Sequence, residues 1–134
     1  MKKKITISFI GNSTKFIKVF KSIYPNSILK SYSWRLLGDI LIKQKIKSRS
    51  DVIVICGYDY SSQWYSYQKY YNCNIVYPLK FAKMISKNKT KVFYVDTINK
   101  IKKIKNSKKR YTFSRYEFAK KELRTKLLRN FKFI

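Results

Sequence analysis

Residues 51–56, Asp-Val-Ile-Val-Ile-Cys (DVIVIC), are the stretch of this sequence that decides its fold. The segment is almost wholly apolar, it is rich in β-branched side chains, and Gly57 follows it directly. Strands of a parallel sheet that are covered on both faces have this composition, because neither face needs a polar residue. The segment therefore predicts a central strand of a parallel sheet.

Weaker patterns on both sides of this segment predict alternating strands and helices. Pro25 ends the first helix, and Pro78 predicts a kink or a later start in the second. The predicted strands are 5–10, 27–32, 51–56, 91–95 and 130–134, and the predicted helices are 15–24, 70–87 and 114–129. This alternation indicates an α/β domain with a parallel sheet. Its ligand crevice is expected at the carboxyl ends of the strands, near Gly11, Gly57 and Thr97.

The composition indicates one folded domain with an extreme positive charge. The 134 residues include 45% hydrophobic and 17% aromatic side chains, which argues against disorder. The formal net charge of +26 attracts nucleic acid, anionic membrane surfaces or phosphorylated ligands such as nucleotide sugars. The competing explanation is compositional drift on solvated faces, since the sequence is also rich in Ile, Asn, Tyr and Phe.

The rarer residue types exclude several kinds of site. The sequence contains no histidine, which excludes a Ser-His-Asp triad and His-containing metal sites. Two cysteines far apart, Cys56 and Cys73, make neither a disulfide framework nor a zinc site, so no metal is expected. No apolar run is long enough to cross a bilayer, and the first ten residues are a poor signal peptide. A cytoplasmic protein is the expectation that follows.

Six segments carry a resemblance to a known family. They are IGNSTKFIK (10–18), LGDI (37–40), DVIVICGY (51–58), YNCNIVYPLKFAK (71–83), KVFYVDT (91–97) and YTFSRYEFAKKEL (111–123). In order and spacing they resemble the sugar-nucleotide epimerase/dehydratase family of short-chain dehydrogenases. The resemblance implies a single Rossmann-like NAD(P)-binding domain over residues 1–134, with a doubly wound parallel sheet in three α/β/α layers. The family's C-terminal substrate lobe is expected to be missing.

The same resemblance implies an activity and its catalytic residues. Tyr111, Ser114 and Arg115 fall on the family's Y-x-x-S-K motif, and Thr97 falls on its Ser/Thr position. In that family the tyrosine is the general acid and base, and the neighbouring lysine lowers its pKa. The implied substrate is a nucleotide sugar of surface polysaccharide biosynthesis, oxidised by NAD or NADP. Thr97, Tyr111 and Arg115 are therefore the expected catalytic residues.

Twelve residues fall on positions that hold the cofactor in the family. They are Gly11, Asn12, Lys15, Phe16, Ile17, Arg35, Asp39, Ile40, Cys56, Gly57, Tyr58 and Asn74. Among them Arg35 follows the second strand, where a cation can meet a 2′-phosphate and favour NADP over NAD. These assignments come from the resemblance alone.

Departures from the family's motifs predict an impaired cofactor site. Asn12, Lys15 and Lys18 stand at its three glycines. Lys15 would bring a long side chain where backbone should approach phosphate, and Lys18 would crowd the sheet. Arg115 replaces the catalytic lysine with a cation of different geometry. The expected protein is therefore an epimerase/dehydratase-like chain that has lost cofactor binding or catalysis, or binds a phosphorylated ligand in another pose.

The segment that carries the catalytic motif has other interpretations. Ser114 and Glu117 fit a capping box, which would start a helix at Ser114 and leave Tyr111 before it. A second pair, Tyr116 and Lys120, has the same spacing but fits the flanking motif less well.

Two further functions remain open from the sequence. A non-catalytic module for nucleic acid or another polyanion would use the basic run 100–110 and the Tyr-rich stretch 58–71. Packing against the sheet edge is the competing explanation for Trp64, Tyr67 and Tyr71. A regulatory subunit that forms homo- or hetero-oligomers is the third hypothesis.

Overall fold

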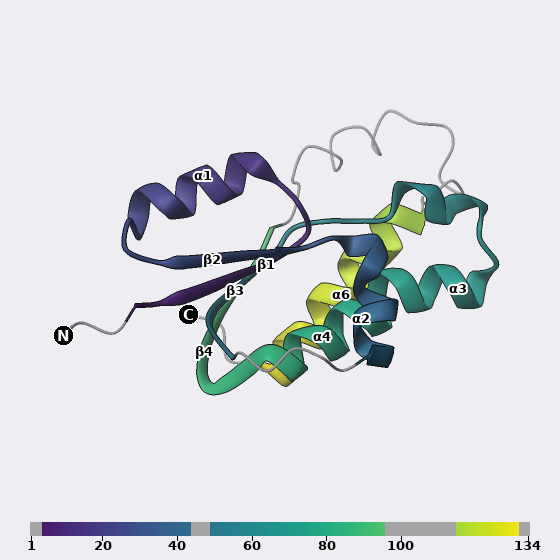
Figure 1. Cartoon of the computed structure of the whole chain (residues 1–134). Helices are drawn as coiled ribbons and strands as arrows, with labels where there is room; N and C mark the ends of the chain where they lie inside the picture. Colours follow the sequence, from purple (N-terminus) through teal and green to yellow (C-terminus); the bar gives the residue numbers. More distant parts are fainter. Residues whose placement is uncertain (1–3, 44–48, 96–114, 132–134) are drawn as a thin grey trace.

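A four-stranded parallel sheet forms the centre of the protein (Figure 1). The computed structural model describes residues 4–43, 49–95 and 115–131. The strands are β1 (Thr6–Ile10), β2 (Ile28–Tyr32), β3 (Ser50–Ile55) and β4 (Ser86–Tyr94), in the order β2-β1-β3-β4. All three pairs of neighbouring strands are parallel, so the predicted α/β Rossmann-like fold is confirmed.

Helices cover both faces of the sheet and complete three layers. The helices are α1 (Thr14–Ile23), α2 (Leu37–Lys43), α3 (Tyr67–Tyr71), α4 (Tyr77–Ile85) and α6 (Arg115–Asn130). Short 3₁₀ turns, η1 (Trp34–Leu36) and η2 (Tyr60–Trp64), precede α2 and α3. Figure 1 shows α1 on one face of the sheet and α2, α4 and α6 on the other. Among the described residues, no helix combines the length and apolar character that a membrane span requires.

The two central strands supply apolar side chains to both faces. Because side chains alternate along a strand, consecutive residues pack against opposite layers. On the α1 side the buried strand residues are Ile7, Phe9, Val52 and Val54. On the other side Ile10, Ile53 and Ile55 pack with Phe81 and Ile85 of α4 and with Leu123 and Leu127 of α6. The prediction that 51–56 is a strand covered on both faces is therefore confirmed.

The second half of the chain differs from its predicted elements. The helix predicted over 70–87 is a continuous helical stretch of α3, a π-helical turn (Asn72–Val76) and α4, and it ends at Ile85. Pro78 is the second residue of α4 and directly follows the π-helical turn, so it lies inside this helical stretch and has no N–H to donate to the preceding turn. Strand β4 begins earlier than predicted, at Ser86, and no element had been predicted for α2.

The structure describes only residues 115–131 of the C-terminal region. Helix α6 begins at Arg115, the residue after the predicted cap. Asn130 belongs to α6, so the strand predicted over 130–134 is wrong at its first residue, and residues 132–134 lie outside the described part. The predicted loop over 100–110 also lies outside it.

Gly11 makes the first turn at the end of β1. Its φ of 113° lies in the region that side-chain-bearing residues rarely adopt. A Cβ at this position would lie 1.9 Å from the carbonyl oxygen of Cys56. The backbone at the end of β1 therefore passes directly against the end of β3, which leaves no room for a side chain at position 11.

Candidate ligand-binding site

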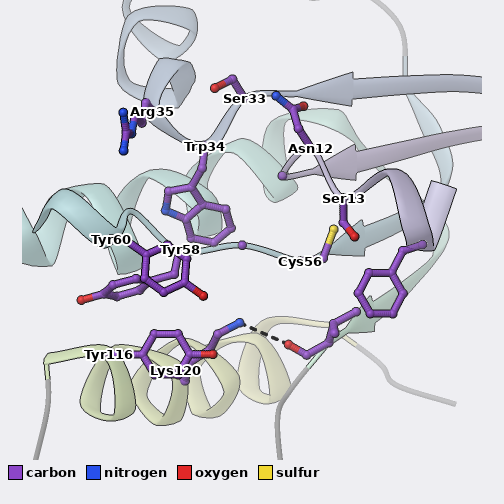
Figure 2. A pocket seen from close by; sticks show the side chains of 14 residues that line it. Asn12, Ser13, Ser33, Trp34, Arg35, Cys56, Tyr58, Tyr60, Tyr116 and Lys120 are labelled. Atoms are coloured by element: carbon purple, nitrogen blue, oxygen red, sulfur yellow. Dashed lines mark hydrogen bonds between the residues drawn. The ribbon is translucent and has the colours of Figure 1, made fainter.

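A cavity of about 550 Å³ opens at the carboxyl ends of all four strands (Figure 2). From β1 the chain continues to β2 at one edge of the sheet, and from β3 it continues to β4 at the other edge. The cavity lies between β1 and β3, where the direction of the strand connections reverses. Open α/β sheets bind their ligands at this switch point. The lining residues are Gly11, Asn12, Ser13, Phe16, Ser33, Trp34, Arg35, Cys56, Gly57, Tyr58, Tyr60, Val95, Tyr116 and Lys120.

Trp34 forms a wall of this cavity immediately after β2. Its ring lies so close to Gly57 that a Cβ there would meet the indole Cε3 at 2.6 Å. The indole Nε1 donates a hydrogen bond of 3.2 Å to Oδ1 of Asn74. Glycine at position 57 therefore lets a large aromatic ring pack against the end of β3, and the hydrogen bond fixes the orientation of that ring.

Asn74 connects the loops that surround the cavity. Its Oδ1 also accepts from the backbone N–H of Asp59 at 3.0 Å, and its Nδ2 donates to Ser62 Oγ at 2.9 Å and to the Tyr70 carbonyl at 3.0 Å. With the indole bond, each polar atom of this buried amide makes two hydrogen bonds, which satisfies its capacity. Asn74 lies behind the cavity wall, where it holds Trp34 and the loop after β3 in place.

Asp59 is a buried carboxylate that orders the Tyr-rich loop. Its oxygens accept hydrogen bonds from the Ser61 backbone N–H and the Tyr65 hydroxyl at 3.0 and 2.9 Å. Nε of Arg35 lies 3.4 Å from Oδ1, and Nη2 of Arg35 donates to Ser61 Oγ at 3.0 Å. These partners offset the cost of burying the charge and keep the guanidinium at the cavity edge.

Three tyrosine rings gather at one end of the cavity. The Tyr58 ring meets Tyr60 and Tyr116 edge-on, with centroids 5.3 and 4.9 Å apart. The Tyr60 and Tyr116 rings are nearly parallel, at 17° and 5.9 Å. Burial raises the pKa of Tyr58, against the opposing effect of its hydrogen bond with Ser62. Figure 2 shows this group apart from Asn12, Ser13 and Cys56, which lie towards the start of α1.

Lys120 supplies a positive charge to the same cavity. Its Nζ donates to the Val95 carbonyl at 3.3 Å and lies 5.2 Å from the centroid of the Tyr94 ring. Burial raises the pKa of Cys56, while the Ser13 backbone and the charge of Lys120 act in the opposite direction. The Cys56 thiol is therefore neutral at physiological pH, and Lys120 is the cation of the cavity interior.

Seven of the twelve residues expected to hold a cofactor line the cavity. They are Gly11, Asn12, Phe16, Arg35, Cys56, Gly57 and Tyr58. Lys15 is exposed and outside the lining, and Ile17 packs between α1 and the sheet. The expectation that Lys18 crowds the sheet is wrong, because this side chain points to solvent on the outer face of α1.

The segment 37–40 takes part in helix packing and not in the cavity lining. It belongs to α2, where Asp39 is exposed and Ile40 packs against the apolar cluster beneath the sheet. A Cβ at Gly38 would lie 2.9 Å from the Tyr77 ring, so this glycine permits close packing of α2 on α4. Asp39 and Ile40 were expected to hold the cofactor, but neither of them lines the cavity.

Of the three expected catalytic residues, Arg115 is the one that the described part of the chain contains. Arg115 does not line the cavity; its Nη1 donates to the carbonyls of Ser62 and Tyr65, and its guanidinium lies over the Tyr70 ring. Thr97 and Tyr111 lie outside the described residues. Tyr116 is one residue after Arg115 and is therefore rotated by about 100° about the axis of α6. Tyr116 lines the cavity together with Lys120, the other member of the second pair.

Sequence reasoning missed five other lining residues of the cavity, Ser13, Ser33, Trp34, Tyr60 and Val95. Ser13, Ser33 and Trp34 come within three residues of the end of a predicted strand, and Val95 is the last residue of the predicted strand 91–95, so their position at strand ends was a usable signal. Tyr60 gave no such signal, because its place depends on the fold of the loop around Asp59. Among the described residues, no three His, Cys, Asp or Glu side chains gather to hold a metal ion.

The Tyr-rich stretch is neither wholly exposed nor wholly packed. Tyr60, Trp64 and Tyr67 are exposed, whereas Tyr70 is fully buried.

Comparison of the chain with family models, curated proteins and solved structures finds no match.

Proposed function

We propose that this chain is a short-chain dehydrogenase-like protein that binds NAD(P) and a nucleotide sugar at the strand-end cavity. The observation that carries the proposal is the position of Tyr116 and Lys120. This tyrosine and this lysine are four residues apart, share one face of α6 and both line the cavity at the switch point of the sheet. A role in surface polysaccharide biosynthesis is part of the proposal and rests on the resemblance of the sequence.

The residues of the cavity fit an anionic nucleotide. Lys120 and Arg35 bring two cations to it, and the nearby carboxylate of Asp59 is already bonded to Tyr65 and Arg35. The first turn of α1 contains no acidic residue and no side-chain cap, so its N–H groups favour an anion. Arg35, three residues after β2, lines the cavity with a cation that can meet a 2′-phosphate, and this supports NADP over NAD.

In the proposed reaction the cofactor takes the hydride and the side chains of this protein handle the proton and the charge. NAD(P), when bound, accepts a hydride from the sugar. Tyr116 exchanges the proton of the sugar hydroxyl as a general base and acid. Lys120, oriented by the carbonyl of Val95, places a positive charge beside Tyr116 and next to a bound anion.

Calorimetric titration with NADPH and NADH, at low and at high salt, tests the proposal. The variants are Lys120→Met, which removes the cavity cation, and Lys121→Met, an exposed control on the same helix. We expect binding by the wild type to survive high salt, and Lys120→Met to weaken it about tenfold while Lys121→Met does not. Binding that vanishes at high salt, or falls equally in both variants, contradicts the proposal, because surface charge alone behaves in this way.

A second candidate, binding of single-stranded nucleic acid, is favoured by the exposed rings of Tyr60, Trp64 and Tyr67. Exposed aromatics beside cations stack bases while the cations contact phosphates. Titration with a single-stranded oligonucleotide checks this candidate. We expect Trp64→Leu and Tyr67→Leu to weaken that complex, whereas neither residue lines the cavity and neither should change NADPH binding.

A further inference from the structure

We infer that Tyr60 is the surface on which the aromatic ring of the bound ligand stacks. The inference rests on the proposed function, since it concerns the ligand of the same cavity. Tyr60 lines that cavity, yet 68% of the residue is exposed. An aromatic side chain at a cavity mouth with an open face offers apolar surface that a flat ligand ring can cover.

Neighbouring rings hold the plane of Tyr60. Tyr58 meets it edge-on at 74°, and Tyr116 lies nearly parallel to it with the centroids 5.9 Å apart. Both contacts lie in the range that aromatic pairs prefer. Because Tyr60 and Tyr116 already form a pair at this distance, a third ring has no space between them. The ligand ring therefore adds to the outer face of Tyr60.

The start of α1 gives the direction of the ligand. Arg35 lies near the tyrosine end, where Ser61 and Asp59 hold it, and Lys120 Nζ lies 5.8 Å from the centroid of the Tyr116 ring. The first turn of α1, whose N–H groups have no side-chain cap and favour an anion, lies at the other end. Figure 2 shows the tyrosine rings at one end and the side chains of Asn12 and Ser13 at the other. Such a site suits a molecule with a planar ring at one end and a phosphate at the other, which is the chemistry of a nucleoside phosphate.

The hydroxyl of Tyr60 does not oppose such a ligand. Burial, with a further effect from Tyr116, raises the pKa of Tyr60 above its ordinary value. The phenol is therefore neutral at physiological pH and does not repel a phosphate. Stacking on a neutral ring depends little on which base is present, because every base has a π-face.

Matched pairs of ligands and variants test the inference. The ligands are AMP, which carries a base, and ribose 5-phosphate, which carries the same sugar and phosphate without one. Both are titrated at high salt into the wild type, Tyr60→Leu, Tyr60→Phe and the control Tyr67→Leu. We expect Tyr60→Leu to weaken AMP about tenfold and to leave ribose 5-phosphate unchanged. Tyr60→Phe, which keeps the ring, and Tyr67→Leu should bind AMP like the wild type.

Two results overturn the inference in distinguishable ways. If the wild type binds AMP and Tyr60→Leu binds it equally well, or loses both ligands alike, the stacking role is wrong while the proposed function stands. If the wild type binds neither AMP nor NADPH at high salt, the proposed function fails together with the inference. Tyr60 is exposed, so Tyr60→Leu should fold like the wild type, which circular dichroism and the unfolding midpoint check.

Discussion

The indole of Trp34 donates a hydrogen bond to the side-chain oxygen of Asn74, a residue 40 positions further along the chain. This contact joins the end of β2 to the π-helical turn between α3 and α4. Because Asn74 also binds the Asp59 backbone and Ser62, one buried amide orients both an aromatic wall of the cavity and the loop after β3. The shape of the cavity therefore depends on a residue that does not line it.

Removal of that amide should destabilise the protein strongly. We expect Asn74→Ala to lower the free energy of unfolding by about 2–4 kcal/mol, since several buried polar groups lose their partners. Urea unfolding followed by tryptophan fluorescence measures the change. The control is Asn72→Ala, whose side chain makes an exposed bond with Gln68 and should cost less than about 0.5 kcal/mol. Equal losses in both variants would argue against Asn74 as the organising residue.

The turn after β1 should tolerate no side chain. Gly11→Ala combines a positive φ with a Cβ 1.9 Å from the Cys56 carbonyl oxygen. We expect this variant to lose about 3 kcal/mol or more of folding free energy, or not to fold. Ser13→Ala, two residues further on, removes a hydroxyl that does not cap α1 and should remain near the wild type. Thermal unfolding of the two variants compares them directly, and a stable Gly11→Ala would contradict the geometry of this turn.

Arg115 should act as a structural connection and not as a catalytic group. Arg115→Lys cannot keep both bonds to the carbonyls of Ser62 and Tyr65, so a loss of about 1–2 kcal/mol in unfolding free energy is expected. Binding of NADPH should change by less than about twofold, because the side chain does not line the cavity. The exposed Arg129→Lys serves as the control for stability. A loss of NADPH binding in Arg115→Lys without a loss of stability would contradict this prediction and support Arg115 as a residue of the active site.

Tyr116 should be needed for turnover of a nucleotide sugar but not for binding. Tyr116→Phe keeps the ring beside Tyr60 and removes only the hydroxyl, so we expect a loss of about 100-fold or more in rate with unchanged NADPH affinity. The rate is followed as reduced cofactor or as new sugar product by mass spectrometry. The control Tyr67→Phe, which removes a hydroxyl from an exposed ring outside the cavity, should retain the rate. Equal rates in Tyr116→Phe and the wild type would exclude Tyr116 as the acid and base.

Alkaline pH should unfold the protein through its buried tyrosines. Burial raises the pKa of both Tyr58 and Tyr70 above the ordinary value of 10.0. The folded state then holds these protons more tightly than the unfolded state, so their contribution is fully present below pH 10.0 and is lost as pH rises through the folded pKa values. Tyr70→Phe should flatten this decline and cost about 1 kcal/mol at neutral pH, through the lost bond to the Arg115 carbonyl.

Unfolding at several pH values compares Tyr70→Phe with the exposed Tyr67→Phe. The control should follow the wild-type profile. A decline that begins well below pH 10.0, or that Tyr70→Phe does not flatten, would show that other groups control alkaline unfolding.

Several local features of the fold could be predicted because short patterns determine them. Apolar residues in 51–56 indicated a strand buried on both faces, and β3 confirms it. The turn at Gly11 also followed from a local signal, and the helix predicted over 114–129 is present as α6 in the described residues. By contrast, α2 was missed, because its seven residues are too few for a clear periodicity.

The sequence by itself determined the α/β architecture and the place of the crevice, since strand periodicity and the turns that follow strands are local properties. Only the tertiary structure decided which residues of α6 face that crevice. Burial of Ala119, Leu123 and Leu127 fixes the rotation of α6 about its axis, and this rotation turns Tyr116 and Lys120 to the cavity and Arg115 to the Tyr70 ring. Arg115 and Lys120 each follow a tyrosine by four residues, so spacing does not distinguish these two cations, and the packing of α6 decides that Lys120 lines the cavity.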